Sequence, residues 1–443
     1  MIKFWLKCVF VTAFVFVMLL FVSFITDLKL FTAFDPVSQA LGQFELTDQV
    51  FSLLRDEPKI DERIVLVNIG NLDRREIAQE LQIVSKYKPK VIGIDSYFDC
   101  EGGLRDTVNC PQLLDTFGNA LLADAIDQAG NVVLVTKLLP KSKTAKNQDA
   151  EDFYDSLEVS DSIFTKRASL GFANLPTDAN YQEDIKQCRS LFPREAVNGK
   201  TLYAFSVMLA MKYDSMKTVK FLARNNEEEL INFRGNAQMV DNRLKMLDTL
   251  ELEQSHYRLL CYAIDHRDVM AEKFDSTLFK DKIVIMGFLG DHIGAPAWED
   301  KFFTPLNKSV AGRANPDMFG PVIHANSTIM ILNEDYINQL EEWQKYFIAT
   351  LLCTLTVALF KVIDDKLPIW YDALSVIVQL VEILLISVVV VWVFWFFNFK
   401  LDLTLSIAVI ALVGPCYDLL KPLQTIIEEW LTKRRERVLT KKI

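Results

Sequence analysis

The sequence contains few of the patterns that mark a catalytic or metal-binding site. Its 443 residues include no G-x-S-x-G nucleophile elbow and no H-E-x-x-H zinc motif. None of the seven cysteines forms a C-x-x-C pair, so a zinc site of that kind has no support. Gly199-Lys200-Thr201 looks like the end of a phosphate-binding loop, but Arg194 stands where that loop needs a glycine. We therefore expect neither an enzyme nor a bound metal or cofactor.

Positive charge is also scarce. The chain has 48 Lys and Arg against 58 Asp and Glu, a formal net charge of -10. A nucleic-acid binder needs a basic face to neutralise phosphates, so nucleic acid is excluded as a partner. Low-complexity tracts and internal repeats are absent from the sequence. What the chain has in excess is apolar residues, which make up 51% of it and concentrate at its two ends.

Four apolar runs predict four transmembrane helices. Residues 8–25 are uncharged and long enough to cross the hydrocarbon core. A cleaved signal peptide is the alternative, but no A-x-A site follows, so we expect an uncleaved anchor. The other three runs are residues 346–360, 374–397 and 403–420. The predicted organisation has four parts, which are an anchor at 1–26, a soluble domain at 27–342, three membrane helices at 343–420 and a tail at 421–443.

The basic residues near the membrane helices predict the orientation. The tail at 421–443 carries seven Lys and Arg residues and should remain in the cytoplasm. Four crossings then place the N-terminus, with Lys3 and Lys7, on the same side. We expect the domain at 27–342 to lie on the non-cytoplasmic side of the membrane. The tail has one apolar helical face, which could contact membrane lipid, a cytoplasmic partner or a second copy, or could simply be a solvated helix end.

The soluble domain shows the pattern of a layered α/β fold. Short β-branched runs at residues 63–69, 90–95, 131–136 and 282–287 predict buried strands. Helical spacing at 77–87 and 121–129 lies between them, and nearly continuous apolar strands separated by amphipathic helices are typical of a parallel sheet covered on both faces. We also expect a helix at 202–213 and an extended segment at 230–234. The predicted fold class is therefore α/β with a largely parallel sheet, plus an all-α membrane region of four helices.

Several runs of the soluble domain resemble a known family, the second class of CHASE domain, which is an extracytoplasmic sensory module of bacterial signalling proteins. The runs are IVLVNIGN, KPKVIGIDSYFD, LLADAIDQAGNVVLV, GFANLPTDAN, LINFRGN, FKDKIVIMGFLGDH, FFTPL and GPVIHANSTIMIL. One membrane helix before the domain and three after it also fit this family, and related receptors suggest a homodimer. The chain departs from the family at residues 72–78, where a Trp-Pro-Trp type segment is usual.

The resemblance implies an extracytoplasmic sensory or ligand-binding function. It also implies a bacterial inner membrane protein whose domain at 27–342 lies on the periplasmic side. Family members usually continue into a cyclase, kinase or other output domain, whereas only residues 421–443 follow the last predicted membrane helix here. We therefore expect a sensor without an output domain of its own, which acts through a membrane or envelope protein partner. The alternative is a structural or assembly subunit of a bacterial envelope complex, in which the domain is a protein-binding scaffold.

Polar residues that follow the predicted strands form the candidate ligand site. In parallel α/β sheets, ligands bind in the crevice at the carboxyl ends of the strands. We expect a pocket there for a polar or cationic small molecule. The alternative is that these side chains cap helices and satisfy turns. The candidate residues are Asn71, Asp73, Asp95, Asp291 and His292.

The cysteines outside the membrane suggest a disulfide. Cys100 and Cys110 flank a glycine-containing loop, and an oxidising compartment favours a bridge between them. Free buried thiols are the alternative. Whether Cys188 and Cys261 also pair is left open, because sequence does not give connectivity.

Two polar residues lie inside the third predicted membrane helix. An ionisable group at the depth of Glu382 is costly in lipid and usually faces protein, and Gln379 lies about one turn earlier. We expect an intramembrane polar contact with another helix of the bundle or of a partner. A protonated Glu382 bonded to a nearby backbone carbonyl is the alternative.

Overall fold

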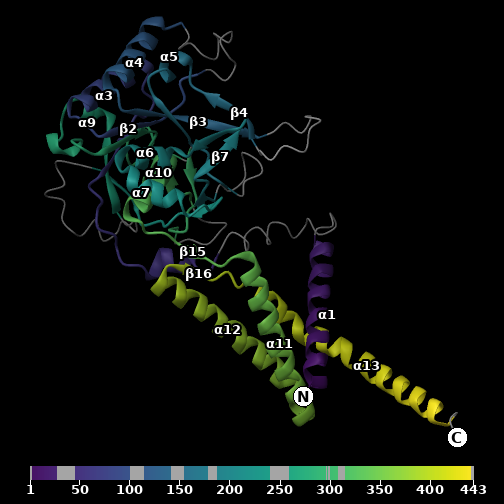
Figure 1. Ribbon diagram of the computed structural model, residues 1–443. Coiled ribbons are helices and arrows are strands. Elements are labelled where there is room, and N and C mark those ends of the chain that lie inside the picture. Colours follow the sequence, from purple (N-terminus) through teal and green to yellow (C-terminus); the bar gives the residue numbers. More distant parts are fainter. Residues whose placement is uncertain are drawn as a thin grey trace. The chain divides into compact units, whose positions relative to one another are not determined.

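In the computed structural model the chain forms two compact units (Figure 1). The soluble unit is Phe51–Ile337, and the membrane unit combines Met1–Val50 with Asn338–Ile443. The structure describes residues 2–26, 45–99, 114–140, 154–177, 187–239, 259–295, 297, 300–307 and 315–440.

A ten-stranded sheet forms the centre of the described soluble unit. Six neighbouring strands, from β10 to β3 in the order below, run parallel, and β4 joins β3 in antiparallel fashion. This confirms the predicted α/β fold with a largely parallel sheet. In spatial order the strands are β10 (Asn236–Met239), β11 (Leu259–Asp265), β1 (Ile64–Asn68), β12 (Ile283–Gly287), β2 (Val91–Asp95), β3 (Val132–Pro140), β4 (Tyr154–Val159), β7 (Arg194–Val197) and β8 (Lys200–Tyr203), with β5 (Ser169–Phe172) also paired to β3.

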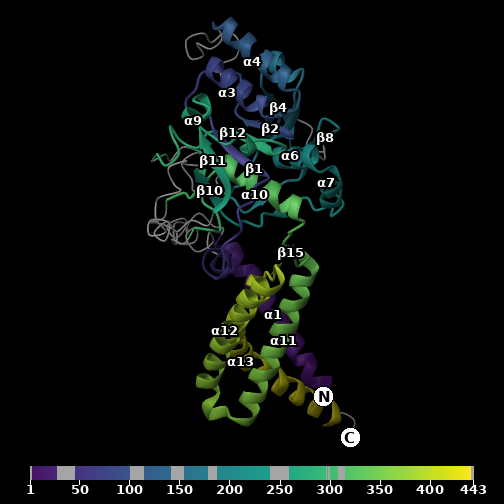
Figure 2. The same cartoon turned by 90° about the vertical axis from the view of Figure 1, so that its left-hand side faces the viewer.

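Helices cover both faces of this sheet, as Figures 1 and 2 show. Strands β1, β12 and β2 are buried almost throughout, which is why they read as unbroken apolar runs. One face carries α3 (Arg74–Lys86), α4 (Thr116–Ala129) and α9 (His266–Met270), and the other carries α6 (Phe205–Tyr213), α7 (Ser215–Leu222) and α10 (Gly320–Asn333).

Shorter elements complete the soluble unit and its connections. They are η2 (Val50–Leu54), α5 (Ser162–Thr165), β6 (Ser190–Leu191), β9 (Glu229–Leu230), η4 (Ser276–Leu278), β13 (Lys301–Phe302) and β14 (Met318–Phe319). The helix expected at 202–213 begins only at Phe205, because β8 first pairs with β7. The extended segment expected at 230–234 is a strand only at its start, where β9 pairs with β6.

Two glycines let the buried helices approach the sheet closely. A Cβ at Gly93 in β2 would lie 2.6 Å from the ring of Phe205 in α6. A Cβ at Gly287, the last residue of β12, would lie 2.5 Å from Pro321 near the start of α10. Both distances are shorter than non-bonded carbon contacts in proteins, so a larger residue at either position would force the facing side chain or its helix to move.

The membrane unit contains the four predicted apolar helices. They are α1 (Ile2–Thr26), α11 (Glu342–Lys366), α12 (Tyr371–Phe397) and α13 (Thr404–Thr440), and among the described residues each is long and apolar enough to cross a membrane. A short helix, η5 (Pro368–Trp370), links α11 to α12. Two short strands, β15 (Asn338–Gln339) and β16 (Phe399–Lys400), pair in parallel, which joins the start of α11 to the turn after α12.

Candidate functional site

The polar residues predicted at the carboxyl ends of the strands lie mostly on the surface. Asn71 and Asp291 are brought together, and their side chains form a hydrogen bond of 2.5 Å. Asp73 is the N-cap of α3 and accepts hydrogen bonds from the backbone amides of Arg75 and Glu76, both at 2.9 Å. His292 is exposed. Asn71, Asp73 and Asp291 thus form local hydrogen bonds. A ligand at this edge of the sheet stays a prediction.

Asp95 lies deeper than the other predicted residues and faces α10. Its carboxylate is 3.9 Å from Nε2 of His324, a fully buried histidine that packs edge-on against Phe205. Burial raises the pKa of Asp95 to about 7, with a smaller contribution from Asp300, and burial lowers the pKa of His324 to about 4. The imidazole is therefore neutral at pH 7, and the two groups are not an ion pair of two full charges.

The cysteine predictions have mixed outcomes. Cys100 and Cys110 lie outside the described residues, so their disulfide stays a prediction. Cys188 and Cys261 are free and fully buried. Burial raises the pKa of both thiols to about 12, so they are unreactive in the folded protein.

The two polar residues of α12 contact different neighbouring helices. Glu382 accepts a hydrogen bond of 2.9 Å from the hydroxyl of Thr356 in α11. Gln379 donates to the backbone carbonyl of Ile410 in α13 at 2.7 Å. A Cβ at Gly414 would lie 3.0 Å from the Gln379 side chain, so this glycine leaves room for the amide. Both side chains thus form hydrogen bonds to neighbouring helices of this chain. Such partners are needed because polar groups at membrane depth find no water to bond.

A pocket of about 260 Å³ opens at the opposite edge of the sheet, where the parallel strands begin. Asp61 comes just before β1 and its backbone amide bonds the carbonyl of Leu260 near the start of β11 at 2.7 Å. The last turn of α10 forms another wall of the pocket, with Ile329, Met330 and Asn333. We call this cavity the junction pocket, and its lining includes Lys59, Asp61, Arg234, Leu260, Ile329, Met330, Asn333 and Asp335.

Two ion pairs supply charged side chains to the junction pocket, which are Arg234 and Asp335 of one pair and Asp61 of the other. The Arg234 guanidinium donates from Nε and Nη2 to one oxygen of Asp335, with an Nε to Oδ2 distance of 3.0 Å. Arg63 donates to both oxygens of Asp61, and its Nε lies 2.9 Å from Asp61 Oδ1. Arg63 also donates to the side-chain oxygen of Asn333 at the end of α10. The pocket therefore contains both signs of charge, each held in place by a partner.

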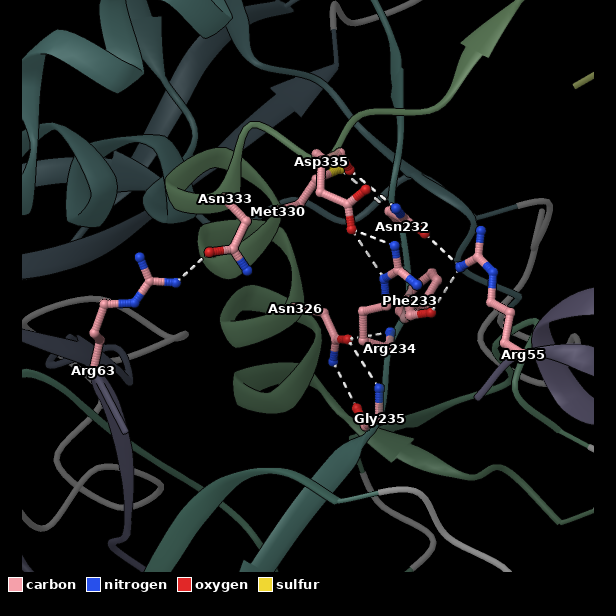
Figure 3. A network of polar contacts seen from close by, with 10 residues as sticks. All are labelled: Arg55, Arg63, Asn232, Phe233, Arg234, Gly235, Asn326, Met330, Asn333 and Asp335. Atoms are coloured by element: carbon pink, nitrogen blue, oxygen red, sulfur yellow. Dashed lines mark hydrogen bonds and ion pairs between the residues drawn. The ribbon is translucent and has the colours of Figure 1, made fainter. Parts of the chain in front are cut away.

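Asn232 joins the two chain segments that border the junction pocket (Figure 3). Its side-chain oxygen accepts a hydrogen bond from Arg55, and its side-chain amide donates to the backbone carbonyl of Asp335 at 3.0 Å. Arg55 lies 4.3 Å from the centre of the Phe51 ring. Residues 51–61 follow the first membrane helix in the sequence, and Asp335 comes seven residues before α11 begins at Glu342. Asn232 therefore bridges the segment that enters the soluble unit and the segment that leaves it.

Asn326 in α10 holds the backbone around Arg234 in place. Its side-chain oxygen accepts from the amide of Arg234 at 3.0 Å, and its side-chain nitrogen donates to the carbonyl of Gly235 at 2.9 Å (Figure 3). The amide side chain of Asn326 thus takes the place of a strand partner for the backbone of Arg234 and Gly235. After Asn333, Glu334 adopts a left-handed conformation, with φ at 54°, which ends α10 and turns Asp335 back toward Arg234.

Sequence reasoning named none of these pocket residues as functional. The run LINFRGN was used only as a mark of family resemblance, although an arginine between two asparagines in an apolar extended run is a usable signal. Chemically, the junction pocket combines cations, carboxylates, an amide and buried apolar side chains. Such a lining suits a small organic molecule that has both polar and apolar parts.

A family model described as CHASE2 domain matches residues 11–360, which is more than half of the chain. Neither the curated proteins nor the solved structures contain a match. The matched range includes the junction pocket and extends into the apolar parts of α1 and α11.

Proposed function

The chain belongs to the CHASE2 domain family, and on this premise we propose that it is a membrane sensor whose soluble unit binds a small molecule in the junction pocket. The observation that carries the proposal is the bridge made by Asn232. A ligand that contacts Lys59 and Asp335 acts directly on the two segments that connect the soluble unit to membrane helices. Ligand binding can then shift the conformational equilibrium of those two segments, and a sensor needs such a shift to pass on its signal.

We propose that the signal passes to a partner protein in or near the membrane. The described part of the chain consists of a soluble α/β unit and apolar helices, and sensory binding rather than catalysis is the activity that the family suggests. We further propose that the soluble unit lies in the periplasm and that both termini are cytoplasmic, because basic residues gather in the tail at 421–443. Reporter fusions test the orientation. A periplasmic alkaline phosphatase fusion should be active after residue 337 and inactive after residue 443.

A ligand screen that favours no chemical class tests the sensor proposal. The full-length protein in detergent is screened by thermal shift against amino acids, organic acids, sugars, polyamines and nucleosides. Any compound that stabilises it is then followed by hydrogen exchange. The proposal expects a bound compound to slow exchange in both residues 51–61 and residues 335–341. If no compound of any class stabilises the protein, the sensor proposal is wrong. Protection confined to residues 68–73 and 290–293 would instead assign binding to the carboxyl edge of the sheet.

Affinity purification from native membranes tests the partner proposal. The tagged protein is purified in mild detergent, and co-purifying proteins are quantified with and without a stabilising compound. A sensor predicts a partner whose recovery changes when that compound is added. A stoichiometric envelope complex that does not respond to it would favour the scaffold function. Recovery of the protein alone, or as a homodimer, would exclude a stable partner.

A further inference from the structure

The unused hydrogen-bond donors of the junction pocket indicate what it binds. Arg234 donates to Asp335 through Nε and Nη2, which leaves Nη1 with no partner among the described residues. Asn333 accepts from Arg63 through its oxygen, and its side-chain amide nitrogen has no partner within the described ranges. Lys59 is exposed at the pocket and forms no ion pair with any residue that the structure describes. These three groups together favour a carboxylate.

The carboxylates of the pocket are not equivalent. Both oxygens of Asp61 accept hydrogen bonds from Arg63, so its charge is compensated. Asp335 uses only Oδ2 for Arg234, and Oδ1 accepts no hydrogen bond from the described residues. The pocket thus offers an open acceptor with negative charge beside the open donors. A ligand that satisfies both must carry a donor with positive charge as well as a carboxylate.

The apolar wall and the size of the pocket limit the rest of the ligand. Leu260, Ile329 and Met330 line the pocket and are buried, with exposures of 2%, 3% and 2%. The volume of about 260 Å³ exceeds the roughly 150 Å³ of a cavity that holds benzene. It lies below the roughly 300–1,000 Å³ of sites for drug-sized ligands. A compact molecule with a small apolar group fits these limits, whereas a nucleotide or a peptide does not.

We propose that the junction pocket binds a small zwitterion, an α-amino acid with an apolar side chain. This inference rests on the proposed sensor function, because it names the ligand class of the same pocket. The ligand carboxylate accepts hydrogen bonds from Lys59 and Arg234 Nη1. The ligand ammonium donates to Asp335 Oδ1, and its side chain packs against Leu260 and Met330.

Calorimetric titration of the full-length protein with three matched compounds tests this ligand class. Leucine carries the carboxylate and the ammonium, leucinol lacks the carboxylate, and 4-methylpentanoate lacks the ammonium. We expect leucine to bind and each analogue to bind at least about tenfold more weakly, because each loses a charge-assisted hydrogen bond. Binding of either analogue as tightly as leucine would overturn the proposal.

A pair of lysine variants locates the binding site. Lys59→Met removes the exposed cation at the pocket, and we expect it to weaken leucine binding about tenfold. Lys200→Met removes an exposed lysine in β8, at the other end of the strand order, and should leave binding unchanged. Equal affinities of the two variants would refute the assignment. If leucine does not bind but a sugar or polyamine protects residues 51–61 and 335–341, the ligand class is wrong and the sensor function stands. If no compound of any class binds, both the sensor function and the ligand class are wrong.

Discussion

The guanidinium of Arg234 donates two hydrogen bonds to a single carboxylate oxygen of Asp335, which lies 101 positions later in the chain. The pair joins the irregular segment after β9 to the turn that ends α10. Because both residues also line the junction pocket, the same contact that shapes the pocket fixes the segment leading to α11.

This ion pair should contribute modestly to stability. Its side chains are 32% and 30% exposed, so solvent screens their attraction. In a double-mutant cycle with Arg234→Met and Asp335→Asn, we expect a coupling free energy of about 1 kcal/mol or less. Urea unfolding of the full-length protein, followed by pulse proteolysis, provides the four values. A coupling of several kcal/mol would mean that the pair is a main support of the fold rather than part of a binding surface.

Asn326 should contribute much more than the ion pair. It is 1% exposed, and its amide bonds the backbone of Arg234, Gly235 and Val322. Asn326→Ala leaves those buried backbone groups without partners, and we expect a loss of about 2–4 kcal/mol in the free energy of unfolding. Gln128→Ala is the matched control, because the Gln128 amide donates to Asp124 on the exposed surface of α4, and it should cost less than about 0.5 kcal/mol. Similar losses in the two variants would contradict the role of Asn326.

The parts of the fold that could be predicted are those with a local signal. Strands β1, β2 and β12 are short, β-branched and buried on both faces, so their sequence is sufficient to identify them. Helix α3 has a polar face and an Asp73 cap, which also makes it readable. Helix α10 has neither feature. Residues from Gly320 to Leu332 are buried all round, so no alternation of polar and apolar positions reveals the helix.

The junction pocket could not be predicted because it depends on long-range pairing. Strand β1 lies between β11 and β12, which both come from the last part of the soluble unit. Strand β11 was not predicted, although it supplies Leu260 to the pocket wall. The general rule for parallel sheets directs attention to the carboxyl ends of strands. The charged residues of this pocket gather at the amino ends, where Asp61 precedes β1 and Asp335 follows α10.

A buried carboxylate in α3 predicts a specific dependence of stability on pH. Glu80 is fully buried and neither of its oxygens has a hydrogen-bond partner among the described residues. Burial, with a smaller contribution from Asp265, raises the pKa of Glu80 from 4.5 to about 8. The folded state therefore binds more protons than the unfolded state between these values, and stability falls as pH rises through that window.

Glu80→Gln removes this titration while it keeps the shape of the side chain. The stability of the variant relative to the wild type should rise between pH 4.5 and 8 with a slope of at most about 1.4 kcal/mol per pH unit. Above pH 8 the difference should be constant. Unfolding of both proteins across this pH range measures it, and a difference that does not vary with pH would show that Glu80 is ionised in the folded state.

The cysteines predict a definite pattern of thiol reactivity. Cys188 and Cys261 are free and fully buried, so a soluble maleimide should label them only after unfolding in urea. Peptide mapping without reductant should find these two thiols free and Cys100 joined to Cys110. Rapid labelling of Cys188 in the folded protein would contradict its burial, and labelling of Cys100 would exclude the predicted disulfide.

The polar contacts of α12 predict how the membrane helices hold together. Gln379 donates to the carbonyl of Ile410 in α13. Cys416 lies two turns further along α13 and is 1% exposed, so its thiol reports on the packing of this helix.

Gln379→Leu removes the interhelical hydrogen bond, which is worth about 0.6 kcal/mol on average in membrane proteins. It also replaces the planar amide that lies against Gly414 with a branched apolar group. We therefore expect an apolar thiol reagent to label Cys416 faster in this variant, while Ile377→Leu, at an exposed position of α12, should leave the rate unchanged. Equal labelling rates in the two variants would mean that apolar packing, and not the Gln379 contact, holds α12 on α13.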